Sequence, residues 1–150
     1  MTTRFSKQAE QLLRRAGWHP GRRASELVSL WKASPALSDS FEMFESAEQI
    51  LLEFGGLSVN QRGPGQTCAR EPFTIDPTLA AYEIDRFTEF SNLLKTRLYP
   101  LGEAAGGYYF LAVGENNRIY LLMEDIKLLG ETMDEALERL LIGIRPTEIE

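Results

Sequence analysis

The spacing of apolar residues changes near Pro100, and this change limits the class of fold that the chain can adopt. Before Pro100, apolar residues recur mainly every three or four positions, which is typical of one side of an α-helix. After Pro100, short apolar runs alternate with glycine-containing turns, as they do in an antiparallel sheet, and a last helical pattern follows. Helices, then a meander of strands, then a final helix predict an α+β fold rather than an α/β fold.

Five helices are predicted, over residues 5–16, 25–32, 40–54, 83–97 and 133–142. In the second of them, Leu27, Leu30 and Trp31 are expected to lie on one face. Ser34-Pro35 is expected to end that helix, because the residue before a proline disfavours the helical conformation.

Capping residues define the ends of the other predicted helices. Asp39 is expected to cap the start of the third helix, with Glu42 as its capping-box partner. Gly55-Gly56 is expected to end it, since glycine accepts the left-handed conformation at a helix end. The caps expected for the first and last helices are Gly17, Thr132 with Glu135, and Gly143.

Six strands are predicted, over residues 57–59, 73–75, 99–103, 108–113, 118–123 and 126–129. The fourth and fifth should form an antiparallel hairpin, because the residues between them include Gly114-Glu115-Asn116-Asn117, which favour a turn. The sixth is expected to lie at the edge of the sheet. Residues 60–71 contain Gly63-Pro64-Gly65 and predict an exposed loop.

The chain is acidic overall, and its charge is unevenly distributed. Its 150 residues, which we expect to form one domain over 1–150, carry a net charge of −6. Residues 1–38 contain seven Lys/Arg and two Asp/Glu, a net charge of +5, so the rest carries −11. Such an acidic body repels nucleic acid and suits a basic protein partner, although acidity can also serve solubility alone. Arg14-Arg15 and Arg22-Arg23 are expected to hold the basic segment against this body through pairs with carboxylates.

The opening of the sequence lacks the features of a signal peptide, because residues 1–5 lead directly into polar helical sequence. The longest apolar runs, Tyr108–Val113 and Ile119–Met123, are too short to span a bilayer. Cys68 is the only cysteine, which excludes an internal disulfide. We therefore expect a soluble, cytoplasmic protein that makes no membrane contact.

No group of residues in the sequence matches a catalytic or metal-binding pattern. His19, the only histidine, lies in a Pro-Gly loop, whereas a triad or a metal site needs further partners around it. Cys68 has Arg70 near it but no local histidine, so we expect a partly buried structural thiol. The glycine pairs do not form a phosphate-binding loop. We expect no enzymatic activity, cofactor or metal; a hydrolase with two carboxylates and a metal is kept as an alternative.

A set of short motifs occurs in a specific order between Leu12 and Pro146. The motifs are Leu13–Arg22, Phe54–Leu57, Gly63–Gly65, Arg70–Phe73, Asp76-Pro77, Tyr99–Glu103, Gly130, Glu135–Leu137 and Gly143–Pro146. In this order they resemble the SUKH superfamily of bacterial immunity proteins, and most closely its third family. The resemblance implies an α+β fold whose twisted, mostly antiparallel sheet is flanked by helices. It also implies a cytoplasmic protein of a polymorphic-toxin system that binds a cognate toxin domain, often a nuclease or a nucleic-acid deaminase.

An inhibitor of a nuclease can imitate phosphate, so acidic residues are expected to dominate the surface that contacts the toxin. The predicted contact residues are Glu83, Asp85, Glu103, Tyr109, Glu115, Glu124 and Asp125. Trp18 and Arg22 are expected to anchor the first loop to the sheet, with Gly55 and Gly56 as further structural residues. We expect a monomer or a weak dimer. The main alternative is a regulatory or scaffolding module of the same fold that binds a peptide or small ligand in the concave side of the sheet.

Overall fold

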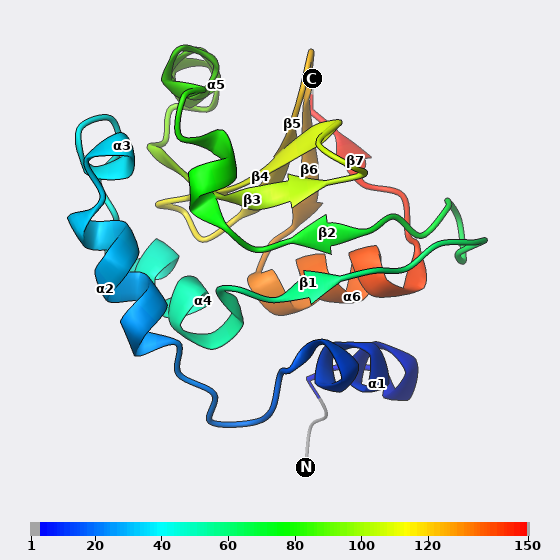
Figure 1. Cartoon of the computed structure of the whole chain (residues 1–150). Helices are drawn as coiled ribbons and strands as arrows, with labels where there is room; N and C mark the ends of the chain where they lie inside the picture. The colour runs from blue at the N-terminus through cyan, green and yellow to red at the C-terminus, as the bar shows by residue number, and fades with distance from the viewer. Residues whose placement is uncertain (1–3, 150) are drawn as a thin grey trace.

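An antiparallel sheet forms the centre of the molecule (Figure 1). The computed structural model describes residues 4–149, so Met1–Thr3, which belong to the opening segment considered above, lie outside the described residues. Seven strands occur in this range, and their order in the sheet follows their order in the chain. They are β1 (Ser58–Val59), β2 (Phe73–Thr74), β3 (Leu98–Ala104), β4 (Tyr109–Gly114), β5 (Ile119–Leu122), β6 (Ile126–Gly130) and β7 (Thr147–Glu148). The predicted α+β fold is confirmed.

Six α-helices and one 3-10 helix accompany the sheet within residues 4–149. They are α1 (Lys7–Ala16), α2 (Ser25–Ala33), α3 (Pro35–Ser38), α4 (Glu45–Phe54), η1 (Pro77–Ala80), α5 (Ile84–Leu94) and α6 (Met133–Ile142). None of these described helices is long and apolar enough to cross a membrane. The short α3 and η1 were not predicted, because four residues are too few to show a helical period. Each begins at a proline, which favours the first turn of a helix.

Gly17, Thr132 and Gly143 are confirmed as caps of the first and last helices, whereas the carboxylate of Glu135 lies 3.0 Å from the guanidinium group of Arg139 rather than completing a capping box. Gly17 follows α1 with φ 115°, and Gly143 follows α6 with φ 73°. At the start of α6, the side-chain oxygen of Thr132 accepts a hydrogen bond of 3.2 Å from the backbone N–H of Glu135. These ends are therefore specified by local sequence.

The predicted start of the third helix is wrong. α4 begins at Glu45, and Asp39 instead follows the last turn of α3. The intervening Phe41 is buried, with its ring centroid 5.3 Å from that of Phe87 and 6.0 Å from that of Tyr99. Burial of this ring in the core outweighs a capping box at Asp39, which contributes only about 1 kcal/mol.

The buried face predicted for α2 is also partly wrong. Leu30 is 66% exposed, whereas Val28 and Trp31 are buried. α2 packs against α3 and α4, and these contacts turn Val28 rather than Leu30 towards the core. A helix of nine residues offers several apolar triplets, and only its neighbours decide which one is buried.

The predicted hairpin of β4 and β5 is confirmed, with Phe110 opposite Leu122 and Val113 opposite Ile119. The prediction that residues 126–129 form the edge of the sheet is wrong, because β7 pairs outside β6. β7 has two exposed residues and no alternation of apolar and polar side chains, so no pattern marks it in the sequence.

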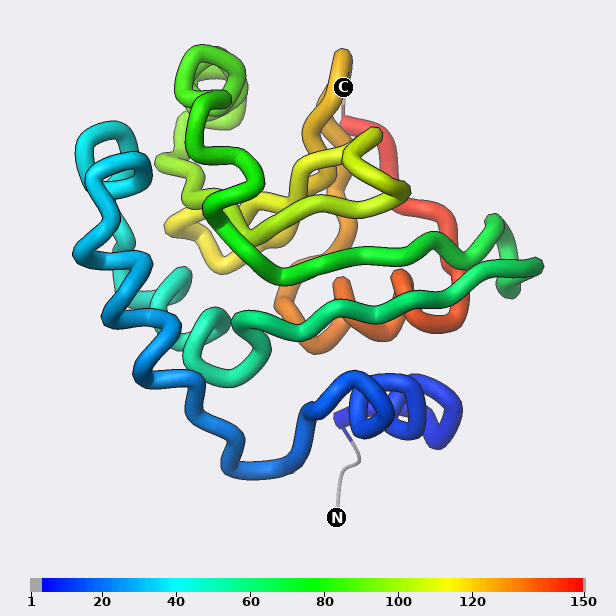
Figure 2. Tube along the Cα trace, viewed as in Figure 1, coloured from blue at the N-terminus to red at the C-terminus, as the bar shows by residue number. Residues whose placement is uncertain are grey.

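Helices cover both sides of the sheet (Figure 1). α5 contacts β3, and the ring of Phe87 lies 6.3 Å from that of Phe110 in β4. Neighbouring residues of a strand point to opposite sides, so Leu111 and its partner Leu121 face the other side. On that side α6 packs against β6, and α1 packs against α6. Figure 2 shows the connection between β1 and β2 extending beyond the sheet, beside the segment that follows α6.

The basic N-terminal segment is held by long-range ion pairs, but among residues 4–149 the predicted doublets form none of them. Arg4 lies 2.7 Å from Glu53 of α4 and 2.7 Å from Asp134 of α6, and hydrogen bonds to both carboxylates raise its pKa. Arg14 pairs with Glu10 of its own helix. Arg22 donates to backbone carbonyl groups instead of carboxylates.

Tyr99 predicts a loss of stability at alkaline pH. Its side chain is 2% exposed, and burial raises its pKa from 10.0 to about 12 because the phenolate is poorly solvated there. Between these pH values the unfolded chain releases the proton first, so the free energy of unfolding falls as the pH rises. We expect Tyr99→Phe to remove this loss, a relative gain of about 3 kcal/mol across the window.

Urea unfolding followed by circular dichroism, from neutral to alkaline pH, measures this effect. Tyr82→Phe is the matched control, because Tyr82 is 91% exposed. Identical pH dependence of the wild-type chain and Tyr99→Phe would show that the phenol of Tyr99 ionises freely in the folded state.

Candidate functional site

The two residues considered as catalytic groups, His19 and Cys68, both lie in loops. His19 is exposed, and its Nδ1 lies 2.9 Å from the carbonyl oxygen of Pro20, so it is the solvated loop residue expected. Cys68 is half-buried in the predicted loop. Within residues 4–149, no group of three or more His, Cys, Asp or Glu side chains is placed to hold a metal ion.

Acidic side chains gather where the start of α5 meets the turn between β5 and β6. Glu83, Asp85 and Glu89 line one shallow depression together with Glu124 of this turn. Asp125 follows Glu124 and is also exposed. We call these five residues the acidic surface. It brings together four of the seven predicted contact residues, although they lie up to 42 positions apart in the sequence.

Arg86 connects the two segments that form the acidic surface. Its Nε lies 3.6 Å from a carboxylate oxygen of Glu83, and its Nη1 donates to the carbonyl oxygen of Met123 at 3.2 Å. Its guanidinium group also lies 5.8 Å from the ring centroid of Phe110. Five carboxylates against one guanidinium group leave the acidic surface strongly negative, and the contacts of Arg86 connect α5 to the turn.

Tyr82 directly precedes the acidic surface and is 91% exposed. Tyrosine rings are frequent anchors in protein interfaces, because they offer a large apolar area and a hydroxyl group. Tyr82 was not among the predicted contact residues, because it lies between η1 and α5 and outside the apolar stripe of the helix. The available signal was an aromatic residue beside acidic ones with no stripe to bury it.

The other three predicted contact residues lie outside the acidic surface. Glu103 is opposite Phe110 in the register of β3 and β4, so it shares the side of the sheet that α5 covers. Tyr109 precedes Phe110 and therefore faces the opposite side. Glu115 lies beyond the far end of β4, where Arg97 donates to both of its carboxylate oxygens at 2.6 Å and lowers its pKa.

Trp18 and Arg22 both contact the end of α4. The indole N–H of Trp18 donates to the carboxylate of Glu53 at 3.0 Å. The guanidinium group of Arg22 donates to the carbonyl oxygens of Glu53 and Gly55, each at 2.7 Å, and partial burial lowers its pKa. Gly56 then takes φ 85° and leads into β1. The first loop is thus connected to the exit of α4 and not directly to a strand.

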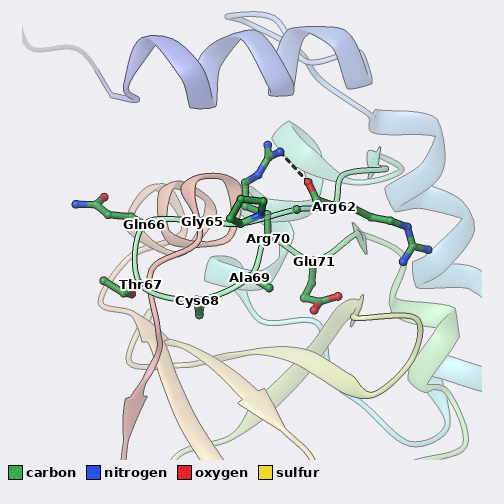
Figure 3. A pocket seen from close by; sticks show the side chains of 10 residues that line it. Arg62, Gly65, Gln66, Thr67, Cys68, Ala69, Arg70 and Glu71 are labelled. Atoms are coloured by element: carbon green, nitrogen blue, oxygen red, sulfur yellow. Dashed lines mark hydrogen bonds between the residues drawn. The ribbon is translucent and has the colours of Figure 1, made fainter.

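The predicted loop over residues 60–71 is attached to the end of α6. The backbone N–H of Thr67 donates to the carbonyl oxygen of Gly143 at 2.8 Å. The loop and the end of α6 approach so closely that a Cβ atom on Gly65 would lie 2.5 Å from the Cα atom of Gly143. Figure 3 shows the side chains of this loop, including the hydrogen bond of 2.8 Å from Arg70 to the carbonyl oxygen of Arg62.

A family model described as SUKH-3 immunity protein matches residues 5–143 of the chain. The chain belongs to this family. Comparisons with curated proteins and with solved structures gave no significant match. The resemblance found in the motifs is therefore confirmed.

Membership of the SUKH-3 immunity protein family supports a role as an immunity protein, which implies that a cognate toxin protein is bound. The matched residues include the acidic surface, the loop attached to α6 and both structural contacts of α4. A protein that inhibits by binding needs an exposed, complementary surface and no assembled catalytic group. The acidic surface is an exposed surface of this kind.

Proposed function

We propose that this SUKH-3 protein neutralises a toxin domain that acts on nucleic acid, either a nuclease or a deaminase, by covering its basic substrate site. The observation that supports the proposal is the acidic surface, in which four carboxylates from two segments line one depression with Arg86 and exposed Asp125 adjoins them. A site that binds nucleic acid needs positive charge for the phosphate groups. The acidic surface matches that charge and competes with the substrate for it.

The proposed interface has an aromatic anchor beside its charges. Tyr82 is exposed next to Glu83, so its ring can enter the partner while the carboxylates meet basic residues. Exposed carboxylates increase the rate of association with a basic partner through long-range attraction. Tyr109 and Glu115 lie on other parts of the molecule and do not belong to this proposed interface.

Inhibition by occupying the toxin's site also bears on cofactors, cellular location and oligomeric state. An inhibitor that occupies a site requires neither catalysis nor a cofactor of its own. We propose that the protein acts in the cytoplasm, where a toxin of this kind meets nucleic acid, and that it binds as a monomer or weak dimer.

Growth rescue tests this function. The chain is co-expressed with the toxin domain encoded beside its own gene, and we expect growth to be restored to that of cells without toxin. A toxin domain of the same chemistry from an unrelated system is the control, and it should stay toxic. Continued growth arrest in cells that contain soluble forms of both proteins would contradict the proposal.

A further inference from the structure

A pocket of about 370 Å³ lies on the side of the sheet opposite α5. Its floor includes Leu121 of β5 and Leu129 of β6, and Leu140 of α6 forms part of a wall. Cys68 and Glu71 contribute the other wall from the loop, and Figure 3 shows both side chains on the side of the loop that faces the strands. We call this cavity the sheet pocket. Its volume lies in the range of small-molecule sites.

Hydrogen bonds hold the walls of the sheet pocket in place. Gln61 is 6% exposed, and its Nε2 donates to the carbonyl oxygens of Glu71 and Leu140, at 2.9 Å each. Both acceptors belong to residues that line the pocket. The backbone N–H of Arg145 donates to the hydroxyl oxygen of Thr67 at 2.7 Å. A pocket with fixed walls loses little conformational entropy when a ligand enters, which favours binding.

The lining of the sheet pocket is basic, in contrast to the chain as a whole. Lys127, Arg139 and Arg145 contribute three positive charges, and Glu71 and Glu148 contribute two negative ones, a net charge of +1. Arg139 is paired with Glu135 at 3.0 Å. Lys127 and Arg145 form no ion pair with the described residues. Their charges are therefore available to an anion.

We propose that the sheet pocket binds an amphipathic organic monocarboxylate, a molecule with an apolar body and one carboxylate group. The apolar body contacts Leu121, Leu129 and Leu140, and the carboxylate lies between Lys127 and Arg145. A carboxylate accepts charge-assisted hydrogen bonds from Lys127 and Arg145, whereas an ammonium group cannot accept a hydrogen bond from either side chain. The proposal does not depend on the toxin, because the pocket lies on the opposite side of the sheet from the acidic surface.

Dodecanoate is the test ligand, used below the concentration at which it forms micelles. Anilinonaphthalene sulfonate, whose fluorescence rises in an apolar site, reports occupancy of the pocket in the full-length protein. We expect dodecanoate to displace the dye in a saturable manner. Dodecylamine has the same apolar chain with a positive charge, and it should be weaker by about 10-fold or more, because its ammonium group cannot accept hydrogen bonds from Lys127 and Arg145.

Charge-removing variants test whether dodecanoate binds in the sheet pocket. Lys127→Gln/Arg145→Gln should weaken dodecanoate binding by about 10-fold, as expected for the loss of charge-assisted hydrogen bonds. The matched control, Arg15→Gln/Arg23→Gln, changes the net charge equally at two exposed residues of the N-terminal segment. It should leave binding within about 2-fold of the wild-type value, because screening weakens distant charges.

Cys68 provides a second measurement on the wild-type chain, since it is the only thiol and lines the pocket. Saturating dodecanoate should slow its alkylation by N-ethylmaleimide at least about 5-fold, because a bound apolar chain excludes the reagent. Three results would each overturn the proposal: no saturable displacement, equal displacement by dodecylamine, or binding that leaves the alkylation of Cys68 unchanged. None of them bears on toxin neutralisation.

Discussion

Gly102→Ala is expected to lower the free energy of unfolding by about 4 kcal/mol, because strain and steric overlap add at this position. Gly102 has φ 153°, and a Cβ atom there would overlap the carbonyl oxygen of Thr74 and lie 2.9 Å from the backbone nitrogen of Asp76. The register of β3 and β4 shifts between Pro100 and Gly102, which marks a bulge. All of these close contacts are with backbone, so no flexible side chain can move away.

Gly106→Ala is the control for this prediction. Gly106 also has a positive φ, 65°, but nothing lies within 4 Å of a Cβ atom added to it. Gly106→Ala should lower the free energy of unfolding by only about 1 kcal/mol, the cost of the left-handed conformation alone. Urea unfolding of both variants measures the difference. A Gly102→Ala variant as stable as Gly106→Ala would show that the segment from Thr74 to Asp76 can move away from β3.

Asp85→Lys/Glu124→Lys is expected to weaken binding of the toxin on the order of 100-fold at low salt, since attractive contacts become repulsive at two points of the interface. Neither carboxylate forms an ion pair with the described residues, so both are free to meet a partner. Glu83 is left unchanged because it lies near Arg86. Most of the loss should appear in the association rate, and added salt should reduce it.

Glu26→Lys/Asp39→Lys is the matched control. It makes the same change in net charge at two exposed carboxylates outside the acidic surface. Glu26 lies in the first turn of α2 as Asp85 lies in the first turn of α5, so the cost to the helix dipole is similar. Surface plasmon resonance at two salt concentrations compares the variants. Equal weakening in both would mean that overall charge, and not the acidic surface, governs binding.

The fold could be predicted where short-range patterns decide the structure. The cap at Thr132, the stop at Gly143 and the hairpin of β4 and β5 depend on residues a few positions apart, and all three are confirmed. The start of α4 could not be predicted, because Phe41 packs against Phe87 and Tyr99, and this burial outweighs the capping box predicted at Asp39. Contacts between distant segments decide that choice, and the sequence alone does not reveal them.

In the candidate site, too, local features could be predicted from the sequence, whereas contacts between distant segments could not. Negative charge after residue 38 and the family resemblance predicted an acidic contact surface, but not which carboxylates would come together. Arg86 joins α5 to the turn after β5 through the carbonyl group of Met123, a contact between residues 37 positions apart. Glu115 seemed equivalent to Glu124 in the sequence, yet the structure pairs it with Arg97. The basic lining of the sheet pocket was missed because its residues are dispersed from Cys68 to Glu148.

Isothermal titration of the purified chain with the toxin domain encoded beside its gene tests the central claim most directly. The account predicts a one-to-one complex with a Kd of about 10 nM or lower at low salt, corresponding to about −11 kcal/mol. It also predicts that a short nucleic acid substrate of the toxin competes with this complex, because both occupy the same basic site. A complex that forms equally well on toxin saturated with substrate, or no binding at low salt, would contradict it.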